Sequence, residues 1–74
     1  MELDILSKFF NDILEDRKTF EIRKDKPNRK FHVGDVLLLK EIDDYGYTGR
    51  EIKVEITYIS NYIDGYKVLQ IKKI

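Results

Sequence analysis

An alternating segment limits the fold of this chain more than any other feature. Every second side chain in this segment is apolar, and these are Ile52, Val54, Ile56 and Tyr58. The positions between them carry charged or hydroxyl side chains. Because successive side chains of a strand point to opposite faces, the pattern predicts a strand with one buried and one solvated face.

Shorter patterns predict the other elements. Strands are expected at residues 2–6, 19–24, 36–42 and 66–71, and a helix with apolar residues three and four apart at residues 7–16. A polar, proline-containing loop of about ten residues follows the second strand. The side chains expected in the core are Phe10, Ile13, Leu14, Phe20, Ile22, Val36, Leu38, Val54 and Ile56.

This order of elements favours a mainly β fold of the α+β class with one principal helix. Five short strands and one helix are too few for a doubly wound parallel sheet, but they can form a small, bent, open barrel. We expect a single domain over residues 1–74, with the helix covering one open end of the barrel.

Size and composition exclude several classes of protein. The chain has 74 residues and no cysteine, so it has neither a disulfide framework nor a thiolate metal site. No apolar run approaches the roughly 18 residues that cross a membrane, and the acidic start is unlike a signal peptide. We therefore expect a cytoplasmic protein with no membrane partner.

Positive charge is concentrated in one window although the chain has no net charge. Residues 17–32 carry seven basic and two acidic side chains, a balance of +5. The neutral total argues against a protein that binds nucleic acid over its whole surface. A local anion-binding face remains open, since the potential depends on where the charges lie.

Lys18, Glu21 and Arg23 form the main candidate site within this window. Strand alternation places Glu21 and Arg23 on one face. Arg23 offers a planar fork to a phosphate or base edge, Lys18 a mobile charge, and Glu21 an acceptor for an exocyclic amine. The structural alternative is an ion-paired group that orders the barrel mouth, worth about 0–1 kcal/mol if exposed.

The loop after this strand is a second candidate. Its cationic side chains are Lys24, Lys26, Arg29 and Lys30. They are suited to following a phosphate backbone, while nearby aromatic side chains are suited to stacking on unpaired bases. The aromatic candidates are Phe31, Tyr45 and Tyr47. The alternative is a loop whose charges only interact with solvent.

No metal or cofactor site is expected. His32 is the single histidine, and Asp35 three residues later does not complete a ligand set. Gly34 and Asp35 are more typical of a turn into the following strand. The chain also lacks a P-loop, a dinucleotide-binding motif and a Ser–His–Asp motif.

The segments LEDRKTFEIRK and FHVGDVLLLKE resemble the ASCH domain of the PUA-like superfamily. The ASCH pattern has a helix, then G-x-K-x-x-E-x-R, then V-G-D before a long strand. Lys18, Glu21 and Arg23 match its charged positions, residues 33–35 match V-G-D, and Asp16 stands where the glycine usually stands. The segment of residues 46–59 also looks like short ASCH-related bacterial and phage proteins of unassigned function.

The resemblance implies a PUA-like open β-barrel with a cleft and a role in RNA binding. A bacterial branch of the family is an amidohydrolase that deacylates N4-acetylcytidine with a lysine, a threonine three residues later and a distant glutamate. Lys18 matches that lysine, but Glu21 stands at the threonine position.

Three functions follow as hypotheses. The favoured one is an RNA-binding module that uses Lys18, Glu21 and Arg23 together with Lys26, Arg29 and Lys30. The second is a small amidohydrolase acting on an acylated nucleoside such as N4-acetylcytidine, which the missing threonine makes less favoured. The third is a bacterial or phage protein-interaction domain.

Overall fold

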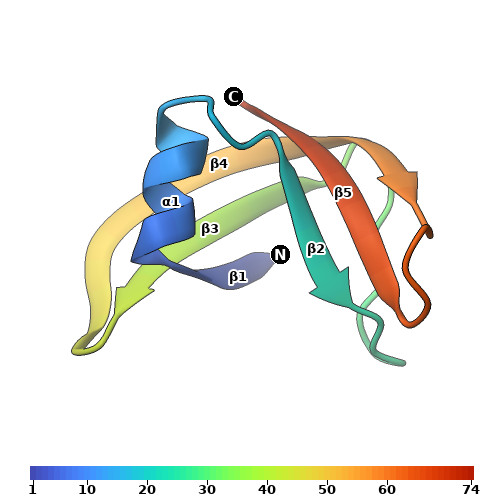
Figure 1. Ribbon diagram of the computed structural model, residues 1–74, viewed down its shortest axis with the longest axis horizontal. Helices are drawn as coiled ribbons and strands as arrows, with labels where there is room; N and C mark the ends of the chain where they lie inside the picture. The colour runs from blue at the N-terminus through green and yellow to red at the C-terminus, as the bar shows by residue number, and fades with distance from the viewer.

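Five strands and one helix follow one another in the expected order in the computed structural model, which describes residues 1–74 (Figure 1). The elements are β1 (Glu2–Leu6), α1 (Ser7–Leu14), β2 (Phe20–Lys24), β3 (Val36–Asp43), β4 (Gly46–Ser60) and β5 (Tyr66–Lys73). The prediction of a mainly β fold with one principal helix is confirmed.

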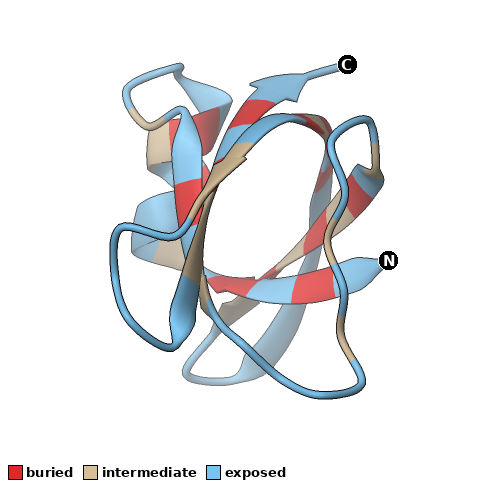
Figure 2. Cartoon of the chain, turned by 90° about the vertical axis from the view of Figure 1, so that its right-hand side faces the viewer, coloured by how far each residue is buried: buried red, intermediate tan, exposed pale blue.

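All five strands belong to one sheet with the order β1-β3-β4-β5-β2. The pairs β3–β4, β4–β5 and β2–β5 are antiparallel, whereas β1 runs parallel to β3. The sheet curls into a half-barrel, as the two views show (Figures 1 and 2). Its two edge strands, β1 and β2, are linked by a hydrogen bond of 3.0 Å from Arg23 Nη2 to the main-chain oxygen of Asp4. We call the zone between these edges the seam.

The core lies on the inner face of the curl and against α1. It contains eleven buried apolar side chains: Leu3, Ile5, Phe10, Ile13, Leu37, Leu39, Ile52, Val54, Ile56, Leu69 and Ile71. Buried positions alternate with exposed ones along the strands (Figure 2). Phe10, Ile13, Val54 and Ile56 are buried as predicted.

The predicted inner faces of β2 and β3 were wrong. Phe20, Ile22 and Val36 are exposed by 38%, 44% and 46%, and Leu38 is only half-buried. The buried positions are instead Glu21 on β2 and Leu37, Leu39 and Glu41 on β3. The segment VLLLKEI is apolar on both faces at its start, so its hydrophobic pattern alone does not select a face.

The long strand β4 keeps its predicted alternation only as far as Ile56. A register shift between Ile56 and Tyr58 places an extra residue against β5. Such a bulge reverses which side chains face inward. Tyr58 is therefore exposed, and Ile59 packs against the core instead.

The helix is shorter than the predicted range of residues 7–16 and ends at Leu14, which is exposed rather than buried. The N–H of Asp16 donates to the oxygen of Ile13, and the N–H of Arg17 donates to the oxygen of Asp12. This pair of bonds is the Schellman arrangement, which ends a helix with one residue in the left-handed region. That residue is Asp16, whose φ is 61°.

The single helix is too short to cross a membrane, and no other segment forms a helix that could do so.

Candidate functional site

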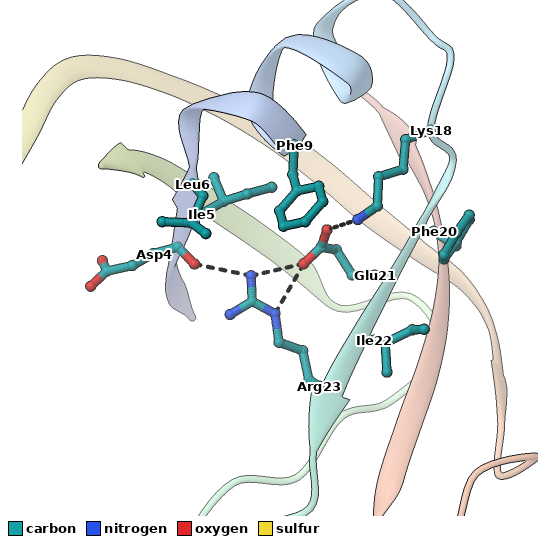
Figure 3. Close-up of a pocket in the computed structure, with 9 residues that line it drawn as sticks. All are labelled: Asp4, Ile5, Leu6, Phe9, Lys18, Phe20, Glu21, Ile22 and Arg23. Atoms are coloured by element: carbon teal, nitrogen blue, oxygen red, sulfur yellow. Dashed lines mark hydrogen bonds and ion pairs between the residues drawn. The ribbon is translucent and has the colours of Figure 1, made fainter. Parts of the chain in front are cut away.

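A pocket of about 480 Å³ opens in the seam, and we call it the seam pocket (Figure 3). It is bounded by the end of β1, the first turn of α1, the segment before β2, and β2 itself. Its lining residues are Asp4, Ile5, Leu6, Phe9, Lys18, Phe20, Glu21, Ile22 and Arg23. The curl of the sheet thus brings the predicted site residues Lys18, Glu21 and Arg23, which we call the trio, together with a group of apolar side chains.

Glu21 lies at the base of this pocket with only 4% of its surface exposed. Its Oε1 accepts a hydrogen bond from Lys18 Nζ. Its Oε2 accepts from Arg23 Nε at 3.0 Å and from Arg23 Nη2 at 2.8 Å. Glu21 is therefore satisfied as a buried charge, and it fixes the position of both cations.

Arg23 has fewer free N–H donors than the sequence predicted. Its fork is already used within the chain, on Glu21 and on the main-chain oxygen of Asp4. The side chain spans the seam from β2 to β1 (Figure 3). Nη1 makes no hydrogen bond within the chain, so it is the nitrogen that retains free donors.

Lys18 lies between two aromatic rings. Its Nζ is 5.0 Å from the ring centre of Phe9 and 5.1 Å from that of Phe20. Both distances are within the range of cation–π attraction. The rings keep 38% of their surfaces exposed, and Leu6 and Ile22 are exposed by 48% and 44%. The seam pocket thus combines an ionic base with an apolar rim, as ligand sites commonly do.

The seam pocket carries no excess of charge. Two cations, Lys18 and Arg23, are matched by two carboxylates, Glu21 and Asp4. Asp4 also accepts a hydrogen bond of 2.7 Å from the hydroxyl of Tyr47, and this bond raises the pKa of Tyr47. The positive balance of residues 17–32 must therefore be located elsewhere.

The positive charge of residues 17–32 is concentrated on the loop that follows β2. A second hollow of about 580 Å³, the loop pocket, is lined by Asp25, Lys26, Pro27, Arg29, Lys30, Phe31, His32 and Lys67. It brings together the predicted cations Lys26, Arg29 and Lys30. Lys67 joins them from β5 because it is the register partner of Arg23. Sequence reasoning missed Lys67, since only the pairing of β2 with β5 places it here.

The predicted stacking residues are divided between two regions. Phe31 is half-buried against the core, with the guanidinium carbon of Arg29 at 5.3 Å from its ring centre. Tyr45 lies in the β3–β4 turn and is almost fully exposed, and Tyr47 is the second residue of β4. Phe31 therefore lies in the loop pocket, whereas neither tyrosine lines it or the seam pocket.

A buried ionic group outside both pockets was also missed. Glu41 is 2% exposed and accepts hydrogen bonds from Arg50 Nε at 2.8 Å, Arg50 Nη2 at 2.7 Å, and Thr48. These bonds lower the pKa of Glu41 from 4.5 to about 2. Arg50 also donates to Asn11 and lies over the ring of Phe10. The group ties the β3–β4 hairpin to α1, and no motif in the sequence marks it.

Comparison with known proteins identifies relatives without a described activity. The family model "Domain of unknown function (DUF3850)" matches residues 1–71. An "Uncharacterized 12.9 kDa protein in GpA 3'region" of Escherichia phage P2 is 32% identical over 71 residues. That match covers 92% of this chain and 63% of the phage protein. The chain therefore spans less than two thirds of this relative's length.

Proposed function

The chain belongs to the DUF3850 family of domains of unknown function, and we propose that it is a nucleic-acid-binding module, with RNA preferred, that holds an unpaired base in the seam pocket. The observation that carries this proposal is the pair of half-exposed rings, Phe9 and Phe20, on either side of Lys18. Aromatic rings that stack on bases are the usual means of holding single-stranded RNA.

In this proposal the polar groups of the pocket orient the base. Arg23 Nη1 and the remaining N–H donors of Lys18 face acceptors on the base edge. Glu21 accepts nothing from the ligand and instead holds Lys18 and Arg23 in place. Specificity would then come from a few fixed donors within an apolar pocket.

The resemblance to ASCH domains supports the same proposal. It extends over the trio and over the V-G-D at residues 33–35, and the half-barrel with a side cleft is the fold that such domains imply. We propose that the chain is an ASCH-related, PUA-like domain of the bacterial or phage cytoplasm.

The amidohydrolase alternative is less well supported. The nine residues that line the seam pocket include none with a hydroxyl group, and Lys18 is already bonded to Glu21. A hydroxyl nucleophile activated by a neighbouring base is the usual requirement for such acyl transfer. We expect no release of cytidine from N4-acetylcytidine by the natural chain; steady release that stops in Lys18→Ala would establish the enzyme instead.

A titration followed by amide chemical shifts tests the binding proposal. Nucleosides and short RNAs and DNAs should shift the amides of residues 4–9 and 18–23. Phe20→Leu should weaken binding by about 1–3 kcal/mol, the usual value of stacking on one base. Tyr62→Leu is the control, since Tyr62 is 85% exposed in the β4–β5 turn. Equal losses in both variants, or shifts confined to another face, would refute the proposal and favour a protein-interaction domain.

A further inference from the structure

Three hollows are lined by β1, by β2 and by the loop that follows β2. The seam pocket uses residues 4–6 of β1, and a hollow of about 320 Å³ beside it uses residues 1–3. This intermediate hollow is also lined by Lys26, Asn28 and Arg29. Lys26 and Arg29 line the loop pocket as well, so the intermediate hollow adjoins it. The order of residues along β1 and the shared Lys26 and Arg29 thus place the intermediate hollow between the seam pocket and the loop pocket.

The two outer hollows differ in chemistry. The seam pocket is rich in apolar side chains and balanced in charge. The loop pocket has one aromatic hydrocarbon ring, that of Phe31, and four permanent cations against the single carboxylate of Asp25. That carboxylate is 3.8 Å from Lys67, which leaves Lys26, Arg29 and Lys30 without an acidic partner. The seam pocket suits a base, and the loop pocket suits a phosphate.

The guanidinium of Arg29 is fixed in position beside the loop pocket. Its Nη2 donates to the main-chain oxygen of Lys24 at 2.6 Å, and its guanidinium lies over Phe31. Its Nε is buried and has no hydrogen-bond partner. A guanidinium that is already fixed in place binds a phosphate at a low entropic cost, because few side-chain rotamers remain to be lost.

We propose that the loop pocket is a phosphate subsite and that the three hollows form one track, so that the ligand is an RNA oligonucleotide rather than a nucleoside. The base end of the track rests on the proposed function, whereas the phosphate subsite stands on the charges of the loop pocket alone. β1 is about 16 Å long at roughly 3.3 Å per residue. This length accommodates several nucleotides at about 3.4 Å per stacked base.

The phosphate subsite is tested without any base. Tripolyphosphate added to the natural chain should shift the amides of residues 25–32 and of Lys67, with an affinity that falls as salt rises. The variant Lys26→Gln/Lys30→Gln should lose at least about fivefold in this affinity. The matched control is Lys53→Gln/Lys72→Gln, which removes the same charge from exposed lysines of β4 and β5 that line none of the three hollows.

The track is tested with uridine, its monophosphate, and oligouridylates of two to six residues, with oligodeoxyuridylates in parallel. In the natural chain a hexamer should bind at least about tenfold more tightly than the monophosphate. Once its base is in the seam pocket, its phosphate reaches the loop pocket within the same complex. In Lys26→Gln/Lys30→Gln this difference should disappear while the affinity for uridine stays within twofold. The slope of the logarithm of the binding constant against the logarithm of the salt concentration should also become shallower by about one to two in that variant.

Each outcome separates the two proposals. If tripolyphosphate shifts the loop but no nucleoside shifts the seam pocket, the phosphate subsite stands and the base-binding function fails. If uridine binds and the hexamer binds no more tightly than the monophosphate, the track is wrong and the seam pocket alone is the site. Equal losses of tripolyphosphate affinity in the loop and control variants would show that the loop pocket is not a subsite.

Discussion

At the residue scale, Asp16 occupies a conformation that L-residues rarely adopt. Its φ of 61° is the only positive value among the non-glycine residues. Glycine is the usual residue at this place in a Schellman turn. The carboxylate of Asp16 is 3.4 Å from Lys73 Nζ, which gives the aspartate a partner that glycine would lack.

Substitution of Asp16 should therefore separate backbone conformation from charge. Asp16→Ala should lower the free energy of unfolding by about 1–2 kcal/mol, because a β-carbon without a local hydrogen bond makes the left-handed conformation costly. Asp16→Gly should stay within about 1 kcal/mol of the natural chain, since glycine adopts this φ freely. Urea denaturation measures both values. An alanine variant as stable as the glycine variant would mean that this turn does not constrain the folded chain.

Glu41 should make stability depend on pH in acid. Its folded-state pKa of about 2 lies below its ordinary 4.5, so its bonds to Arg50 and Thr48 stabilise the fold fully above about pH 4.5. That contribution is lost as the pH falls from 4.5 toward 2. Glu41→Gln should be less stable at neutral pH and show a flatter profile in this window. Two profiles that run parallel between pH 4.5 and 2 would contradict the role given to Glu41.

At the element scale, the sequence predicted which segments form strands but not always which face of a strand is buried. The buried part of β4 was predictable because apolar and polar residues alternate strictly from Ile52 to Ile56. β3 begins with four apolar residues, and its buried face includes Glu41, which the hydrogen bonds from Arg50 and Thr48 of β4 make tolerable. β2 is an edge strand whose Glu21 lies on the buried side, bonded to Lys18 and Arg23, while Phe20 and Ile22 lie on the opposite, half-exposed side.

Alanine substitutions test this assignment of faces. Leu39→Ala should cost about 2–5 kcal/mol, because the side chain is fully buried and leaves a cavity. Val36→Ala and Ile22→Ala should each cost less than about 1 kcal/mol, since both side chains are more than 40% exposed. The denaturant midpoints of the three variants, at unchanged m-values, measure these losses in the free energy of unfolding. A larger loss at Ile22 than at Leu39 would restore the faces that the sequence pattern favoured.

At the scale of the whole molecule, the half-barrel is joined across its open side by one side chain. Arg23 bonds to β1 through the main chain of Asp4 while it is held on β2 by Glu21. The trio was predictable as a group because the three residues lie close in sequence. Its setting was not, since Asp4, Leu6 and Phe9 come from a segment that meets β2 only when the sheet curls.

Arg23→Lys should loosen the seam. Lysine cannot make the two bonds to Glu21 and also reach Asp4, so the free energy of unfolding should fall by about 1–3 kcal/mol. Amide hydrogen exchange should rise more in β1 and β2 than in β4, which has a partner strand on both sides. Arg17→Lys is the control, because Arg17 is largely exposed and should change stability by no more than about 0.5 kcal/mol.

The parallel pairing of β1 and the edge position of β2 also determine when the seam forms. The strands β3, β4 and β5 are joined by short turns, so they can pair early in folding. β1 must wait for β3, which lies 36 positions further along the chain in their register, and β2 must wait for β5. On a ribosome, β2 has no partner strand until β5 has emerged. We therefore expect the candidate site to be the last part of the molecule to assemble, because a nascent chain that has not yet exposed β5 lacks the partner strand that positions β2.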